Sequence, residues 1–276
     1  MVDGLGIPQG ALHESIYADF PALCRCIEQY SVPLDANLGL PGEPQSATGQ
    51  TALFTGINGA KLLGRHLSGF PNAELRETIR KENIFGKLQA RGLSVTFANA
   101  YARQTEQTLP RAFRSVTTVA TLSAFGRTRT REDMLAGRAV YHDLTRHWLK
   151  VHGGVNVPLI TEEEAAAHLL GIVRSVDFCL FEYFLTDHAG HRGDDSQKCA
   201  ILGSLDRFFQ FLMDGVDTEN ELFLWTSDHG NLEQPSTKQH TRNPVPFCAY
   251  GWRARDVREG MNSILQVCDR VERVLS

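Results

Sequence analysis

Four short runs rich in β-branched and aromatic residues, separated by long helical stretches, constrain the fold of this chain most strongly. The runs span residues 93–98, 176–185, 222–226 and 245–250. Each run is largely apolar, as expected of strands that are covered on both faces. Helices are predicted around and between these runs, over residues 13–30, 51–67, 73–91, 162–175, 196–213 and 256–275. This alternation is typical of an α/β protein in which helices sandwich a mostly parallel sheet.

The size and charge of the chain limit its partners. With 276 residues, the chain is long enough to bury a core on both faces of a sheet. Its 28 Lys and Arg residues against 32 Asp and Glu residues give a formal net charge of −4, which does not favour nucleic acid binding. No apolar stretch approaches the ~20 residues of a membrane span, and no signal peptide is evident. We therefore expect a cytoplasmic protein that binds a small molecule, and leave homo-oligomerisation open.

The segment from residue 101 to residue 170 differs from the rest of the chain. The strand signal fades there, and residues 101–131 carry six arginines against a single acid, Glu106. Insertions above a rigid α/β scaffold commonly determine specificity. We predict a small, largely helical cap over residues 101–170 and a metal-binding core formed by residues 1–100 and 171–276. A solvated basic surface is an equally good interpretation of the arginines.

Side chains suited to metal binding and catalysis gather in five short segments. These are VDGLG with Asp3, PQSATGQTALFTG with Ser46, TDHAGHRG with Asp187 and His191, SDHGN with Asp228 and His229, and QHTRNPVPF with His240. Loops that follow parallel strands converge on one crevice, where α/β proteins bind their ligands. Imidazole and carboxylate groups suit zinc or manganese, and three of each are enough for two ions. The sequence therefore predicts a binuclear site for two divalent ions, Zn or Mn.

These five segments, in this order, resemble the alkaline phosphatase superfamily, and within it the cofactor-independent phosphoglycerate mutases. The resemblance covers about residues 1–60 and 171–276. It implies two sets of metal ligands, one of Asp3, Ser46, Asp228 and His229 and one of Asp187, His191 and His240. It also implies that the Ser46 hydroxyl attacks phosphorus and becomes transiently phosphorylated.

The position of Ser46 before a predicted helix supports this role independently. The amides of Ala47 and Thr48 would face a phosphate at the positive end of the helix dipole. A serine hydroxyl is a poor nucleophile at neutral pH, and metal coordination favours its alkoxide. Three alternatives stay open: Ser46 as a simple helix N-cap, Thr48 as the reactive hydroxyl, and His188 as a ligand in place of Asp187.

Two features depart from the mutases. Those enzymes carry a large phosphate-transferase domain after the nucleophile helix, whereas only about 130 residues separate Gly56 from Asp187 here. Superfamily members also lead into the metal-binding aspartate with a full apolar strand, whereas only Met1 and Val2 precede Asp3. We therefore expect hydrolysis rather than mutase activity, and a first strand that either begins upstream or is a stub.

The function that these observations favour is a binuclear metal-dependent phosphohydrolase that acts on a small phosphorylated metabolite through a phosphoserine. Guanidinium groups suit a second phosphate or a carboxylate, so we predict substrate contacts from Arg111, Arg114, Arg127 and Arg129. The alternatives are a phosphoglycerate mutase-like phosphotransferase, or a hydrolase of phosphodiesters, phosphonates or sulfate esters. An inactive metal-binding regulatory protein is a third alternative, although a decayed site would have lost at least one ligand. HExxH, P-loop and GxGxxG motifs are absent.

Overall fold

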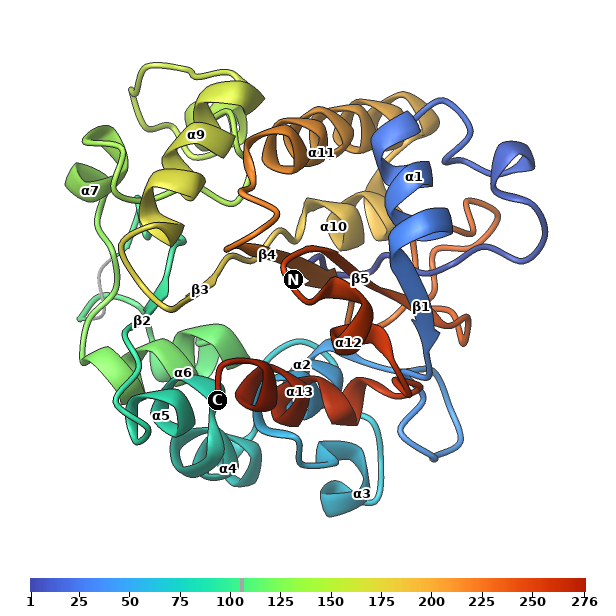
Figure 1. Cartoon of the computed structure of the whole chain (residues 1–276), viewed down its shortest axis with the longest axis horizontal. Coiled ribbons are helices and arrows are strands. Elements are labelled where there is room, and N and C mark those ends of the chain that lie inside the picture. Colours follow the sequence, from blue (N-terminus) through green and yellow to red (C-terminus); the bar gives the residue numbers. More distant parts are fainter. Residues whose placement is uncertain (105–106) are drawn as a thin grey trace.

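A computed structural model describes residues 1–104 and 107–276 of the chain. Glu106, the single acid of the basic segment, lies outside the described residues. Helices lie on both sides of a narrow set of strands (Figure 1). This arrangement confirms the predicted α/β class.

Two hydrophobic clusters fill the spaces between the strands and the two helical layers. One cluster includes side chains of α1 (Pro21–Tyr30), α9 (Glu162–Val173), α10 (Leu185–Arg192) and α11 (Asp195–Gly215). The other includes side chains of α2 (Ser46–Thr55), α3 (Gly59–Leu63), α4 (Ala73–Glu82), α5 (Ile84–Gln89), α6 (Val116–Phe125), α12 (Ala254–Arg258) and α13 (Val267–Val274). Within β5 (Val245–Gly251), Phe247 and Ala249 face the second cluster and Cys248 the first, as strand alternation requires. Strand β5 is therefore covered on both faces.

The strands form two ladders. Strands β1 (Ser31–Leu34), β5 and β4 (Leu222–Thr226) pair in that order, and β5 is antiparallel to both neighbours. Strands β2 (Val95–Phe97) and β3 (Phe178–Leu180) form a parallel pair. Val2 joins the two ladders, because it bridges Tyr183 in parallel and donates its amide to the carbonyl of Thr226 at 2.9 Å.

The sheet is mixed, which differs from the mostly parallel sheet expected from the sequence. The chain passes from β4 to β5 through residues 227–244, which contain no helix that could carry it back across the sheet. Without such a crossover, the next strand runs antiparallel to the one before it. The four predicted strands all occur, but β1 was not predicted, because it has four residues and includes Pro33.

The predicted helices occur with changed ends. Helix α1 begins at Pro21, at a helix start where proline is favoured. Helix α2 begins at Ser46 and ends at Thr55, and its C-cap is Gly56, whose φ of 75° favours glycine. The predicted helix over residues 73–91 breaks at Asn83, whose side chain caps α5. Among the described residues, no helix combines the length and apolar character of a membrane span.

The predicted cap contains α6, α7 (Arg131–Leu135), α8 (His147–Val151) and most of α9. Helix α6 packs on α4 and α5, and its Val116, Val119 and Ala120 belong to the second main cluster. A separate small cluster lies in the remainder and consists of Ala100, Met134, Ala139, Tyr141, Leu149 and Val157. The division of the chain at residues 100 and 170 stays a prediction.

Candidate metal centre

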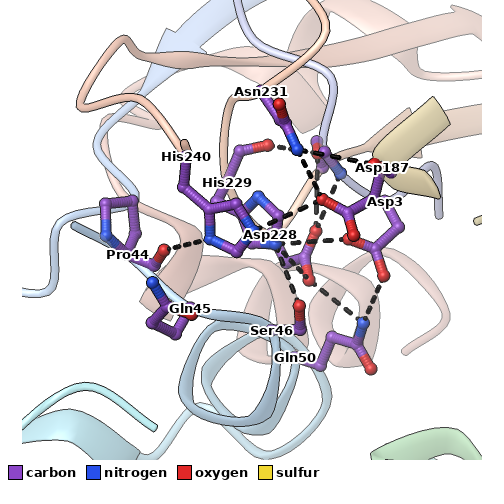
Figure 2. A network of polar contacts seen from close by, with 12 residues as sticks. Asp3, Pro44, Gln45, Ser46, Gln50, Asp187, Asp228, His229, Asn231 and His240 are labelled. Carbon is purple, nitrogen blue, oxygen red and sulfur yellow. Dashed lines mark hydrogen bonds and ion pairs between the residues drawn. The ribbon is translucent and has the colours of Figure 1, made fainter. Parts of the chain in front are cut away.

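The structure brings together all seven residues predicted to act as ligands or nucleophile. Asp3 ends the N-terminal segment, and Asp228 and His229 follow β4. Asp187 and His191 lie on α10, Ser46 begins α2, and His240 lies in the loop before β5. Figure 2 shows these side chains, except His191, pointing toward one another. The five segments quoted from the sequence therefore converge on one site.

Asp187, His191 and His240 form one cluster of candidate ligands. Asp187 Oδ1 lies 3.3 Å from Nε2 of His191 and 3.4 Å from Nε2 of His240. His191 and Asp187 are one helical turn apart, so they project from the same face of α10. This is the second ligand set that the sequence implied.

The two imidazoles of this cluster are oriented for a cation. His191 Nδ1 lies 2.7 Å from the Lys238 carbonyl, and His240 Nδ1 lies 2.7 Å from the Pro44 carbonyl. A carbonyl oxygen only accepts, so each Nδ1 carries the proton. In the neutral rings, the lone pairs of the two Nε2 atoms then face each other at 2.8 Å. Two facing lone pairs repel, whereas a metal ion between them would bind both.

Asp3, Asp187 and His229 form a second cluster. His229 Nε2 lies 3.3 Å from Asp3 Oδ1, 3.6 Å from Asp228 Oδ2 and 3.0 Å from the Ser46 hydroxyl. Asp187 is within reach of both clusters, whereas the sequence assigned it to one. The stacked rings of His229 and His240, 3.8 Å apart at 17°, connect the two groups.

The buried carboxylates of this site need positive charge. Asp3 and Asp228 share the side-chain amide of Gln50, which donates to each at 3.0 Å. Asp3 Oδ1 is buried and accepts no hydrogen bond from the described residues. Burial, together with the charges of Asp228 and Asp187, raises the pKa of Asp3 well above its usual value. The ion pairs that these carboxylates form within the described chain are with histidines. Such a donor set fits divalent cations.

Burial and the neighbouring carboxylate shift the pKa values of the histidines in opposite directions. Burial lowers the pKa of His229, which favours the neutral ring that a metal requires. The hydrogen bond with Asp187 raises the pKa of His191. For Asp187, burial acts to raise the pKa, but the hydrogen bonds that the protonated rings of His191 and His240 donate bring it below its usual range. Ionisation of the Asp187 carboxyl group therefore stabilises its contact with His191.

The three alternatives left open by the sequence are disfavoured by the geometry. Gln45, not Ser46, occupies the N-cap of α2, and the Ser46 hydroxyl is directed to His229. The Thr48 hydroxyl is buried and donates to the carbonyl of Gln45 at 3.0 Å. His188 packs edge-on against Trp148, with ring centroids 4.8 Å apart. Ser46 is thus the hydroxyl that faces the clusters.

Two glycines allow the loops of the site to approach closely. Gly4 has a φ of 67°, and a Cβ there would lie 2.8 Å from the Cβ of Asp187. At Gly49 on α2, a Cβ would lie 2.7 Å from the carbonyl oxygen of Asp228. Larger side chains at these positions would separate Asp3 from Asp187, and Ser46 from His229.

Three polar residues of the site were not predicted as functional. Gln50 lies one turn after Ser46 on α2, a spacing that could have identified it. Asn231, the last residue of the SDHGN segment, donates to Asp187 Oδ1 at 2.9 Å. Glu233 accepts the amides of Gly6 at 3.0 Å and Asn231 at 2.7 Å, and also the Thr241 hydroxyl and the Asn243 side chain. Glu233 therefore holds together three loops that carry ligands, through contacts that no local pattern indicates.

The predicted substrate arginines are placed less favourably. Arg129 is half-buried and donates to the carbonyls of Phe97 and Arg138 and to the Thr96 hydroxyl, so its guanidinium holds β2. Arg111 and Arg127 are exposed, and Arg114 is half-buried. Among the contacts the structure gives, none links Arg111, Arg127 or Arg129 to the clustered ligands. Their role in substrate binding stays a prediction.

Comparison with known proteins shows what this fold and this Asp/His/Ser centre resemble. A sequence profile of the metalloenzyme superfamily matches residues 150–270. Two solved structures cover the whole chain: a protein of Pyrococcus horikoshii (TM-score 0.59, 17% identity, 94% of that chain) and the alkaline phosphatase of the Antarctic bacterium TAB5 (TM-score 0.56, 12% identity, 96% of that chain). Both have the same fold as this chain.

Relatives in sequence point to one branch of this superfamily. The 2,3-bisphosphoglycerate-independent phosphoglycerate mutase of Methanococcus aeolicus is 23% identical over 104 residues, which are 38% of this chain and 25% of the mutase. The corresponding mutase of Pseudomonas fluorescens is 34% identical over 91 residues, 30% of this chain and 18% of the mutase. The matches thus span a quarter or less of these mutases. The profile match, the mutase matches and the shared fold together support an alkaline phosphatase-like metalloenzyme near the phosphoglycerate mutase branch.

Proposed function

We propose that the protein is a binuclear metal-dependent phosphohydrolase that acts on a small phosphorylated metabolite through a phosphoserine at Ser46. The observation that carries this proposal is the position of the Ser46 hydroxyl, 3.0 Å from Nε2 of His229 and at the first residue of α2. A nucleophile, a candidate metal ligand and a helix N-terminus therefore meet at one point. Such a combination suits attack on a phosphorus atom.

The residues present fit two divalent ions, Zn or Mn. Asp187, His191 and His240 would hold one ion, and Asp3, Asp228, His229 and Ser46 the other. Asp187 is within reach of both clusters and would contribute to each. When bound, the ions would favour the Ser46 alkoxide and stabilise negative charge on the phosphoryl oxygens. Asn231 and Gln50 keep the carboxylates in place through their side-chain amides.

Helix α2 provides the site for the transferred phosphoryl group. Its first turn lacks intrahelical acceptors for its amides, and the first helical bond runs from Gly49 to the carbonyl of Gln45 at 2.8 Å. The amides of Ala47 and Thr48 can therefore donate to phosphoryl oxygens beside the Ser46 hydroxyl. The Ser46 Oγ–P bond forms as the bond from phosphorus to the leaving oxygen breaks, and water then cleaves the phosphoserine.

Hydrolysis is favoured over mutase chemistry by the middle of the chain. Of the residues between Gly56 and Asp187, helices α4, α5 and α6 and strand β2 pack in the main core. The remaining part is too short for a second domain that would retain and reorient a phosphoglycerate. Free phosphate and the dephosphorylated metabolite are therefore the expected products.

The test is a screen of phosphorylated metabolites with metal-stripped protein that is reloaded with Zn²⁺ or Mn²⁺. Phosphate release that depends on added metal supports the proposal, as does a phosphate adduct on Ser46 found by mass spectrometry after rapid acid quench. Phosphodiester, phosphonate and sulfate ester substrates, and interconversion of phosphoglycerates, are measured in parallel. Faster turnover of any of these would replace the proposed reaction with that one. Full metal binding without turnover of any substrate would favour an inactive metal-binding protein.

A further inference from the structure

An aromatic surface lies beside the metal centre, on the helix that carries two of the candidate ligands. Phe184 is the N-cap of α10 and comes three residues before Asp187, which His188 and His191 follow. Positions three, four or seven residues apart share one face of a helix, with about 5–6 Å between neighbours. All four side chains therefore lie on one side of α10, and the organic part of a molecule held at Asp187 can reach Phe184.

The requirements of helix α10 do not explain a phenylalanine at position 184. A helix N-cap favours Ser, Thr, Asp or Asn, whose side chains accept from the first amides, and the Phe184 side chain makes no such bond. The ring is also 37% exposed, whereas its neighbours Tyr183 and Leu185 are buried in the first hydrophobic cluster. The ring of Phe184 is therefore available to a ligand.

The predicted cap places a second ring, that of His142, against Phe184. Val140 pairs in parallel with Asn99, just beyond β2, so His142 lies near the edge of the sheet where ligands bind in α/β proteins. The two rings stack with centroids 4.0 Å apart at 28°. Nδ1 of His142 is buried and has no hydrogen-bond partner within the described chain. Burial, together with the charge of His188, lowers the pKa of His142 to about 3, so the ring is uncharged at neutral pH.

Trp148 of α8 extends this surface along α10. Its ring meets that of His188 edge-on, with centroids 4.8 Å apart at 77°. The carboxylate next to these rings in the cap, that of Asp143, accepts the backbone amides of Arg146 at 2.7 Å and Leu149 at 3.2 Å. Asp143 is thus engaged in holding the start of α8. The surface presents aromatic rings to a ligand, and these do not favour the hydroxyl groups of a sugar over a planar ring.

We propose that this aromatic surface binds a planar aromatic ring in the organic part of the substrate. The surface consists of His142, Trp148, Phe184 and His188. The inference rests on the proposed function and narrows the substrate to phosphate esters that carry such a ring, as nucleoside monophosphates and aryl phosphates do. A ring placed on Phe184 would continue the stack that His142 begins, and such stacking contributes about tenfold or more in affinity. A sugar phosphate or a phosphoglycerate would lack this contribution.

The experiment compares phosphate esters that differ in the ring, with Zn²⁺-loaded protein. Adenosine 5′-monophosphate is measured against ribose 5-phosphate, which lacks the base, and phenyl phosphate against cyclohexyl phosphate, whose ring is saturated. We expect kcat/KM for phosphate release to be at least about tenfold higher for the aromatic ester of one pair or of both. A preference in the first pair alone would assign a nucleotide, and a preference in the second pair would show that a simple aryl group is enough.

Variants of Phe184 test whether the preference comes from this surface. Phe184→Leu removes the ring but keeps an apolar side chain, and should raise KM for the aromatic ester about tenfold more than KM for its ring-free partner. Phe184→Tyr keeps the ring and should retain the preference. Phe113→Leu is the matched control, because this exposed ring packs on Phe70 instead. A full preference for the aromatic ester in Phe184→Leu would overturn the proposal.

Binding measured without turnover separates this inference from the proposed function. Adenosine 5′-monophosphate and phenyl phosphate are titrated into Zn²⁺-loaded Ser46→Ala protein, and the fluorescence of Trp148 is followed, with Trp148→Phe identifying its signal. We expect quenching by at least one ester, with Kd about tenfold higher when Phe184→Leu is added. Such quenching without phosphate release by the unmodified protein would keep the aromatic site and reject the phosphohydrolase. Phosphate release with no preference in either pair would keep the phosphohydrolase and overturn the aromatic site, and neither quenching nor release would reject both.

Discussion

The Ser46 hydroxyl lies 3.0 Å from Nε2 of His229, a residue 183 positions further along the chain. The contact joins the first residue of α2 to the loop after β4, so the two halves of the chain must fold together to form it. It also places the serine oxygen beside a candidate metal ligand, where its pKa can be lowered by a cation. The reactivity that we propose for Ser46 is therefore a property of the assembled site.

The first prediction concerns this hydroxyl. Ser46→Ala should lower kcat for phosphate release by on the order of 10³-fold or more, because the nucleophile is lost. Metal content should stay close to that of the unmodified protein, since the carboxylates and imidazoles remain. Thr48→Ala, which removes a hydroxyl in the same helical turn, is the matched control and should keep most of the activity. Steady-state kinetics and metal analysis check both variants, and an active Ser46→Ala protein would assign the attack to another group.

Asp187 is the candidate ligand shared by both clusters, and this leads to the second prediction. Asp187→Asn should reduce bound metal from about two ions per chain to fewer than one, because both sites lose a charged ligand. His191→Gln should remove about one ion, since His191 belongs to one cluster alone. Asp195→Asn is the control, because its side chain is 95% exposed at the start of α11. Mass spectrometric metal analysis of dialysed protein measures the ratio, and two retained ions in Asp187→Asn would contradict the shared role.

A third prediction concerns Glu233, which accepts bonds from three loops of the site. Glu233→Gln should lower the free energy of unfolding by on the order of 3 kcal/mol, because an amide has a single accepting oxygen. Its NH₂ would face either the backbone amides of Gly6 and Asn231 or the side-chain amide of Asn243. Metal affinity should fall about tenfold or more, as expected when support for ligands is lost. Glu219→Gln, an exposed change in the turn before β4, is the control. Denaturant titration and competition with a chelator measure the two effects; unchanged affinity would limit Glu233 to a structural role.

Much of the site, but less of its surroundings, could be predicted from sequence. Asp228 and His229 follow an apolar strand directly, so local order alone indicates that they lie at a strand end. Glu233 and Arg129 could not be interpreted in this way, because their partners lie far along the chain. The Glu233 bond to Gly6 spans 227 residues, and the guanidinium of Arg129 bonds to β2. The charge of a side chain indicates what it can bind, whereas packing decides which partner it meets.

The sheet, too, could be predicted only in part from the sequence. Strand β4 was predicted with the ends it has, because five consecutive apolar or β-branched residues leave little choice. Its direction relative to β5 depends on the path of residues 227–244, which the apolar pattern does not describe. The candidate metal ligands constrain that path, since Asp228, His229 and His240 all lie at one site.

The last prediction concerns Glu182, a buried carboxyl group at the end of the β3 segment. Its side chain accepts a hydrogen bond from the Thr117 hydroxyl at 2.6 Å, and burial raises its pKa from the ordinary 4.5 to about 7. Between these two pH values the folded protein binds a proton that the unfolded chain has lost. The stabilisation from this proton is therefore complete below pH 4.5 and is lost as the pH rises to about 7. For metal-free protein, we expect the free energy of unfolding to fall over this range by on the order of 3 kcal/mol from this group.

Glu182→Gln should flatten that dependence and stabilise the protein above pH 7, because the amide stays neutral and can still accept from Thr117. Asp177→Asn, an exposed change near the start of β3, is the control. Denaturant unfolding between pH 5 and pH 8 measures the slopes, and equal slopes for Glu182→Gln and the unmodified protein would show that Glu182 does not titrate in this range.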